Sequence, residues 1–176
     1  MMNSLKFESE RLKFRQFRDT DFDDLFAFLS TQEVCAYLPG EEPYNALQVK
    51  KWLDYFIRTF DETKPNLIYA VTSKNQDEVI GYVGLAYVKE FEQNEIMYAF
   101  HPNVWGKGYA TEAASKMKEM AQSLHIEKLI GLTDINNIAS ERVLLKIGYQ
   151  FVKYLEIWGL QMKYFELNLN IVDKIN

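Results

Sequence analysis

The chain of 176 residues contains one cysteine, two histidines and no apolar run long enough to cross a bilayer. The single thiol, Cys35, cannot form an internal disulfide, and the first residues carry neither the basic nor the apolar segment of a secretion signal. His101 and His125 lie far apart with no cysteine at ligand spacing, which argues against a metal site. We therefore expect a cytoplasmic protein with no bound metal and no membrane partner.

The chain also lacks an excess of positive charge, because 20 lysines and arginines stand against 25 aspartates and glutamates. Nucleic-acid-binding proteins usually present a basic face, so we expect no nucleic acid partner, and a cationic acceptor fits better. Hydrophobic residues make up 48% of the chain and aromatic residues 15%, which is ample for a sizeable core. No linker or low-complexity tract interrupts the sequence, and we expect a single domain over residues 1–176.

Hydrophobic periodicity gives a coarse order of elements. Asp19 and Asp21 are expected to cap the first helix, and Trp158-Gly159 is expected to form the turn of a terminal hairpin. The predicted helices follow Asp21 and then span 49–60, 109–124 and 138–147, and the predicted strands span 5–17, 67–72, 79–88, 95–100, 128–133, 149–157 and 160–169. This order indicates an α/β (α+β) fold with a mixed sheet.

The most informative segment, residues 95–113, is predicted to be a strand, a glycine-bearing loop and the start of a helix. Gly106 and Gly108 let the backbone approach a ligand closely. The helix that begins near Tyr109 offers unpaired N–H groups and the positive end of its dipole. The segment therefore predicts an anion site suited to a phosphate or pyrophosphate.

Two familiar nucleotide motifs do not fit this loop. A dinucleotide fingerprint would need glycine at Thr111 and an acidic residue about 20 positions later, which Asp134 supplies only loosely. A Walker loop would need Ser or Thr after Lys107, where the chain has Gly108. The loop alone is also compatible with an ordinary strand-to-helix turn.

A third pattern fits better. Residues Trp105–Ala110 (WGKGYA) resemble the acyl-CoA pyrophosphate loop of the GNAT superfamily of N-acetyltransferases, written Gln/Arg-x-x-Gly-x-Gly/Ala. Gly108 and Ala110 match this pattern. Trp105 departs from it at the Gln/Arg position, in a way known from the branch that contains the ribosomal-protein alanine N-acetyltransferases.

Three further segments resemble the same branch, in the same order along the chain. Residues Ser9–Arg15 (SERLKFR) resemble its Thr-Glu-Arg-Leu-x-Leu-Arg opening, and Ile80–Leu85 (IGYVGL) resemble the strand before the acyl-CoA strand. Residues Asn136–Tyr149 resemble its Asn-x-x-Ser-x-x-Val-Leu-x-Lys-x-Gly-Phe signature. Over roughly residues 8–168 the chain is identified as a member of the GNAT superfamily.

The resemblance implies a mostly antiparallel central sheet of about seven strands, splayed between strands four and five, with about four helices and acyl-CoA in the gap. It implies acetyl transfer from acetyl-CoA to a primary amine, on a protein N-terminus or a small cationic molecule, and is compatible with a homodimer. A non-catalytic acyl-CoA sensor is the alternative, favoured if neither Ser140 nor Glu95 faces the thioester. The residues implied in cofactor binding are Phe100, Trp105, Gly106, Lys107, Gly108, Tyr109, Ala110, Thr111, Asn136, Ser140 and Arg142.

The resemblance also implies roles in catalysis. The backbone N–H of Phe100, often beside a bulge in the family, would polarise the acetyl carbonyl. The usual tyrosine that protonates the thiolate aligns with Leu144, so Ser140 would take that role, unless it is only a helix-start residue. Glu95 would accept the proton of the amine, unless it is only a surface carboxylate. Asn136 would bind the pantetheine arm or cap the helix, a role open to Asn137 as well.

The remaining candidates belong to the acceptor side and to the nucleotide. In the family the loop that contains Glu41 and Glu42 lines the acceptor site, where these carboxylates would attract a cation, although a solvated turn is the simpler interpretation. Tyr37, Tyr44 and Trp52 would form walls of the same site, with core packing as the alternative for Trp52. Arg142 and Lys146 lie one turn apart and would reach the nucleotide phosphates or face water.

Overall fold

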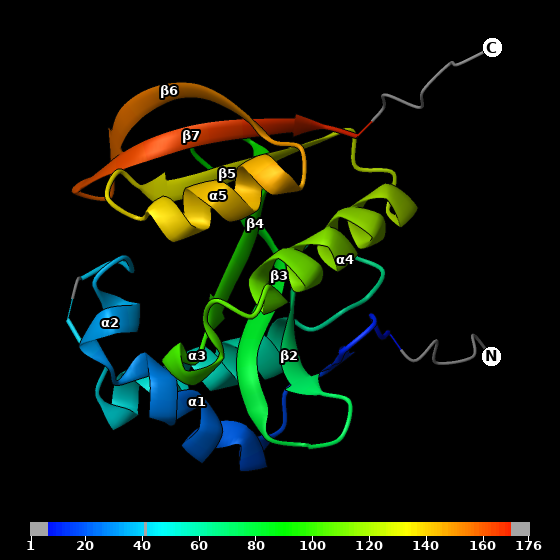
Figure 1. Ribbon diagram of the computed structural model, residues 1–176, viewed down its shortest axis with the longest axis vertical. Helices are drawn as coiled ribbons and strands as arrows, with labels where there is room; N and C mark the ends of the chain where they lie inside the picture. Colours follow the sequence, from blue (N-terminus) through cyan, green and yellow to red (C-terminus); the bar gives the residue numbers. More distant parts are fainter. Residues whose placement is uncertain (1–6, 41, 170–176) are drawn as a thin grey trace.

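The computed structural model describes residues 7–40 and 42–169. Its seven strands form one sheet in the order β1-β2-β3-β4-β5-β7-β6, in which only the β4–β5 neighbours are parallel. Figure 1 shows β5, β7 and β6 together at the top of the molecule, with β2 and β3 below them. The strands are β1 (Leu12–Arg15), β2 (Leu67–Ser73), β3 (Val79–Val88), β4 (Gln93–Phe100), β5 (Lys128–Asp134), β6 (Gln150–Ile157) and β7 (Leu160–Asn168).

Helices cover both faces of the sheet. In the described residues they are α1 (Phe22–Leu29), α2 (Gln32–Cys35), α3 (Ala46–Thr59), α4 (Tyr109–Ser123) and α5 (Ile138–Lys146). Alternate residues of β4 divide between two hydrophobic clusters. Ile96 and Phe100 pack with Met117 of α4, whereas Met97 and Ala99 pack with the residues of α1 and α3. Strand alternation therefore places the side chains of β4 on two chemically separate faces.

The sheet splits between β4 and β5. Their pairing is limited to Asn94 with Leu129 and Glu95 with Ile130, and the six other residues of β4 have no partner in β5. The expected mixed, mostly antiparallel sheet of seven strands, splayed between the fourth and fifth, is thus confirmed. The family's frequent bulge is absent from β4, whose register with β3 runs without a shift from Gln93 to Phe100.

Most predicted elements agree with the structure within a few residues, but the N-terminal strand is much shorter than predicted. Instead of extending over 5–17, β1 covers only Leu12–Arg15 in the described part of the chain. The described residues before it turn back on the strand, because Ser9 N–H donates to the Leu12 carbonyl and Phe14 N–H to the Phe7 carbonyl, both at 2.9 Å. In this turn the backbone N–H of Arg11 donates to the carboxylate of Glu112 at 2.8 Å. Residues 5 and 6 lie outside the described residues.

The region around the first helix also differs from the prediction. Asp19–Asp21 forms a 3-10 turn, and α1 has no side-chain cap. The carboxylate of Asp21 instead accepts hydrogen bonds from the guanidinium of Arg15 at 2.8 and 2.9 Å and from the backbone N–H of Arg18. The four-residue helix α2 was not predicted and accounts for the fifth α-helix.

Candidate functional site

The split between β4 and β5 opens into a cleft of about 1410 Å³, lined by both halves of the sheet and by α2, α3, α4 and α5. Pockets for a single drug-sized molecule measure about 300–1,000 Å³. The cleft is therefore large enough for an extended ligand together with a second, smaller molecule.

The free edge of β4 presents backbone hydrogen-bonding groups to this cleft. His101 N–H donates to the Ile80 carbonyl at 2.9 Å, and Gly81 is paired with Phe100. Because hydrogen-bonded pairs alternate along an antiparallel ladder, Phe100 directs its N–H away from β3 and toward the split. The Phe100 side chain is buried in the core. The side chain of Phe100 therefore packs in the core while its backbone N–H points into the cleft.

Trp105 connects the glycine-bearing loop to the end of β4. Its indole N–H donates to the Phe100 carbonyl at 2.8 Å, while 49% of the residue remains exposed at the cleft. Gly106 and Gly108 have φ values of 75° and 79°, in the left-handed region that glycine adopts without strain. The loop conformation therefore depends on its two glycines.

The start of α4 provides free backbone donors beside the same loop. Gly108 is the N-cap residue and gives no side-chain cap, and the first helical bond to its carbonyl comes from Glu112 N–H at 3.0 Å. The N–H groups of Tyr109, Ala110 and Thr111 consequently have no partner within the helix, and all three residues line the cleft. This end of the helix has the geometry of an anion site.

An N-terminal clamp formed by Ser9, Arg11 and Glu112 holds this loop, although the clamp was not predicted. Glu112 accepts from Ser9 Oγ at 2.6 Å and from Arg11 Nε at 2.7 Å. Arg11 Nη1 donates to the Lys107 carbonyl at 2.8 Å, and its guanidinium lies 4.6 Å from the centre of the Tyr109 ring. The opening motif thus fixes the start of α4 from more than 90 residues away in the sequence.

The start of α5 lies on the other side of the cleft. Asn137 caps the helix by accepting from Ser140 N–H at 3.0 Å, which leaves the exposed side chain of Asn136 available to a ligand. Both residues line the cleft. The sequence is compatible with a cap from either asparagine, and the structure assigns it to Asn137.

A second hydroxyl group accompanies Ser140. Tyr98 Oη lies 3.0 Å from Ser140 Oγ, and both residues line the cleft on the face of β4 that α4 and α5 cover. Burial raises the pKa of Tyr98 to about 12, while the hydrogen bond with Ser140 opposes the shift, so the phenol keeps its proton at neutral pH. Leu144, at the position of the family's usual tyrosine, has no hydroxyl and packs in the core. Tyr98 was missed because its sequence neighbours suggest only an alternating strand.

Glu95 occupies the opposite face of β4, at the last residue that pairs with β5. Burial raises the pKa of its carboxyl to about 8, partly opposed by a hydrogen bond with the Leu132 backbone. Tyr82, Met97 and Ala99 share this face, because residues of one strand alternate and directly paired residues point the same way. The carboxyl group is consequently separated by the strand from the Tyr98 and Ser140 hydroxyls.

The remaining predicted residues divide into those that line the cleft and those that do not. Tyr37, Tyr44 and Trp52 line it, and the rings of Tyr44 and Trp52 stack 6.5 Å apart. Arg142 and Lys146 line it as well.

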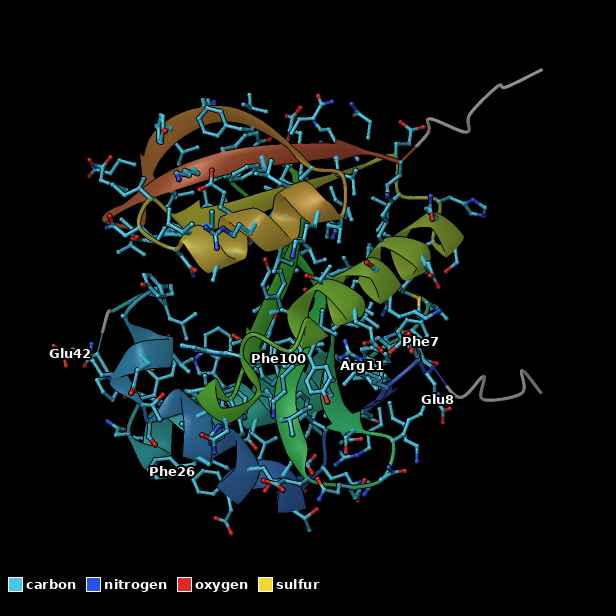
Figure 2. All side chains as sticks on the ribbon, in the orientation of Figure 1. Phe7, Glu8, Arg11, Phe26, Glu42 and Phe100 are labelled. Carbon is cyan, nitrogen blue, oxygen red and sulfur yellow. The ribbon has the colours of Figure 1, made fainter. Side chains whose placement is uncertain are left out.

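Two predicted positions lie off the cleft, and one falls outside the described residues. Lys107 does not line the cleft and instead contributes its carbonyl to the clamp. Glu42 does not line it either, and Figure 2 shows Glu42 at the outer edge of the molecule, far from Phe100. Glu41 lies outside the described residues.

Two kinds of feature are absent from residues 7–40 and 42–169, which the structure describes. No helix in this part of the chain is both long and apolar enough to cross a membrane. No group of three histidine, cysteine, aspartate or glutamate side chains in the same part is placed to hold a metal ion.

Comparison with known proteins identifies relatives over most of the chain. A family model described as acetyltransferase (GNAT) domain matches residues 11–150. The N-acetyltransferase YoaA of Bacillus subtilis, whose function is uncharacterised, is 30% identical over 145 residues, which cover 81% of each chain.

Solved structures share the fold at lower identity. A GNAT-family acetyltransferase from Bacillus anthracis superposes with a TM-score of 0.80 at 21% identity and covers 92% of this chain and 97% of its own. The microcin C7 self-immunity acetyltransferase MccE, solved with acetyl-CoA and AMP, has a TM-score of 0.76 at 14% identity and covers 96% and 97%.

Proposed function

The chain belongs to the GNAT acetyltransferase family, and from that premise we propose that it moves an acetyl group from acetyl-CoA directly to a primary amine. N-acetyl transfer with acetyl-CoA as co-substrate is the activity of the family. The proposal concerns the acceptor, a protein N-terminus or a small cationic amine, and the residues that carry the chemistry. The observation that supports it most is the placement of Glu95 and the Ser140–Tyr98 pair on opposite faces of β4, at the split.

The loop and both helix starts would hold the co-substrate. The free N–H groups of Tyr109, Ala110 and Thr111 would bind its pyrophosphate, with Gly106 and Gly108 allowing close approach. Asn136 and the free edge of β4 would bind the pantetheine arm, and Arg142 at the cleft rim would meet the nucleotide phosphates. The N-terminal clamp positions the loop, and none of its three residues lines the cleft.

The proposed chemical step uses groups on both faces of β4. The amine nitrogen would attack the thioester carbon while its proton passes to Glu95, and the Phe100 N–H would stabilise the negative oxygen that develops. When the C–S bond breaks, the thiolate would take a proton from Ser140, which recovers one from the Tyr98 phenol 3.0 Å away. The Tyr98 phenolate would then regain a proton from water in the cleft, and Glu95 would release to water the proton taken from the amine, so that both groups return to their starting states. Glu95, the base, and Ser140, the acid, lie on opposite faces of β4, so no proton passes directly between them.

A sensor without turnover is not favoured by any observation. That alternative needs Ser140 and Glu95 turned away from the thioester, whereas both line the cleft at the split.

The pH dependence of the rate tests the assignment of Glu95. Because the pKa of Glu95 is about 8, its carboxyl is mostly protonated at pH 7, and we expect kcat/KM to rise about tenfold per pH unit until it levels near pH 8. An alkylamine acceptor with a pKa near 10 is mostly protonated throughout this range, so kcat/KM is expressed per concentration of the unprotonated amine, which removes the acceptor's own titration from the profile. Glu95→Gln should lower kcat/KM at pH 8 by about 10²-fold and abolish the inflection. An unchanged inflection in this variant would contradict the assignment.

The raised pKa of Glu95 also predicts how the melting temperature depends on pH, which can be measured without an acceptor. A carboxyl whose pKa is raised by folding stabilises the native state fully below its unfolded pKa of about 4.3, and this stabilisation is lost as pH rises toward 8. Glu95→Gln should therefore have a higher melting temperature than the parent protein at pH 8, with a smaller difference at pH 4. A variant destabilised equally at both pH values would point to a purely structural role.

A further inference from the structure

The turn between β6 and β7 has an unfavourable residue at its first position. Trp158 and Gly159 form a two-residue connection between the paired residues Ile157 and Leu160. Their φ values are 54° and 77°, so both are positive, as in a type I′ turn. That turn favours asparagine at its first position, and a bulky side chain there is strained. Strain of this kind often marks a functional position.

The Trp158 ring is held in place at the cleft. Its indole N–H donates to Glu90 Oε1 at 2.9 Å, and 49% of the residue is exposed. Glu90 lies in the connection between β3 and β4, on the other side of the split from β6 and β7, and both residues line the cleft. The hydrogen bond therefore spans the two halves of the sheet and fixes the ring at the edge of the cleft.

The cleft that Trp158 lines contains several aromatic and apolar residues. Tyr37 and the side chains of Tyr44, Trp52 and Tyr55 line it from α3 and the segment between α2 and α3. The lining of the cleft also includes Met97, Leu132, Leu160 and Met162, of which the last two lie on β7 directly after the turn that contains Trp158. Leu132 lies two residues beyond Ile130, the partner of Glu95, and thus shares the face of Glu95.

Charge does not single out an ionic ligand for this part of the cleft. The charged side chains added by α2, α3 and the β3–β4 connection are two acids, Glu33 and Glu90, and two bases, Lys51 and Lys89. The acids and bases balance, and Glu90 is already bonded to Trp158. Aromatic surface, rather than net charge, is what this face offers to an acceptor.

We propose that Trp158, held by Glu90, forms with the aromatic lining of α3 a subsite for an aromatic group that the acceptor carries beside its primary amine. The inference rests on the proposed function, because it assumes that the amine approaches Glu95. The shared chemistry is an arylalkyl primary amine, which either a free small molecule or a peptide with an aromatic first residue supplies.

A matched panel of acceptors tests the preference. Phenethylamine is compared with butylamine and putrescine as free amines, and a Phe-Ala-Ala peptide with an Ala-Ala-Ala peptide, by CoA release and by calorimetric binding in the presence of CoA. We expect the aromatic acceptor to have a KM and a Kd about tenfold lower than its aliphatic partner, in at least one of the two pairs. The pair that shows the difference identifies the source of the aromatic group.

The variant Trp158→Asn distinguishes a role of the Trp158 ring in binding the acceptor from a role in folding of the turn. Asparagine suits the turn, so the variant should fold with an unchanged or higher melting temperature and an unchanged Kd for acetyl-CoA, while the tenfold aromatic preference disappears. Tyr154→Asn removes another exposed aromatic ring from the same hairpin, one that does not line the cleft, and should leave the preference intact.

Different results would contradict the aromatic subsite and the proposed acetyl transfer. Equal binding and turnover of aromatic and aliphatic acceptors, or a preference that survives Trp158→Asn, would overturn the subsite while leaving acetyl transfer in place. CoA release that no amine stimulates would instead count against the proposed function.

Discussion

Replacing Gly108 with valine is expected to weaken CoA binding about 100-fold while the protein still folds. The branched side chain would stand at the N-cap of α4, where the backbone is expected to meet the pyrophosphate. Loss of two charge-assisted hydrogen bonds at about 1.5 kcal/mol each gives about 3 kcal/mol, or roughly 100-fold. A Cβ at Gly108 would meet only Arg11 Nη2, at an ordinary 3.5 Å, so the fold has room for it. Calorimetry with CoA measures the effect.

Gly40→Val is the matched control for this experiment. Gly40 also has a positive φ, 97°, and a Cβ there would meet nothing within 4 Å. It does not line the cleft, so the variant carries a similar backbone strain without blocking the anion site. We expect similar losses of melting temperature from both variants and lost CoA affinity only from Gly108→Val. Unfolding of Gly108→Val would mean that the glycine chiefly serves the turn.

Replacing Ser140 with alanine is expected to lower kcat about 10²-fold with little change in the Kd for acetyl-CoA. A proton donor to the departing thiolate acts in the transition state, and general acid catalysis contributes about 10²- to 10⁴-fold. Tyr98→Phe should slow turnover less, because Ser140 keeps its own hydroxyl. The double variant should be little slower than Ser140→Ala, since two groups in one relay do not act additively.

Ser115→Ala provides the control for a lost helix hydroxyl. Ser115 donates from α4 to the Thr111 carbonyl at 2.9 Å and does not line the cleft, so its removal should leave kcat unchanged. A kcat for Ser140→Ala within about threefold of the parent value would reduce Ser140 to a helix-start residue. Independent, multiplicative losses from Ser140→Ala and Tyr98→Phe would contradict the relay.

The parts of the site that could be predicted are local in sequence. The loop from Trp105 to Ala110 contains the glycines, the helix start and the free N–H groups within a few residues, so spacing alone predicts an anion site. The hairpin at Trp158-Gly159 is equally local. Alternation along β4 also places Glu95 and Phe100 on opposite faces without any knowledge of their neighbours.

The parts that were missed depend on contacts between distant residues. Arg11 and Glu112 are separated by 101 positions, and no local pattern indicates that they meet. Tyr98 and Ser140 are 42 positions apart, so a tyrosine in an apolar strand gave no sign of a hydroxyl pair. The role of Trp158 at the cleft requires the position of Glu90 in another hairpin. Such side-chain partners follow from the packing of the two halves of the sheet.

The most direct test of the central claim is the amount of CoA thiol released from acetyl-CoA as a primary amine is added, with the mass of the amine followed in parallel. We predict one thiol released for each amine that gains an acetyl group, at a rate that depends on the amine concentration. CoA that binds and stabilises the protein, with no amine-dependent thiol release and no acetylated product, would contradict the account.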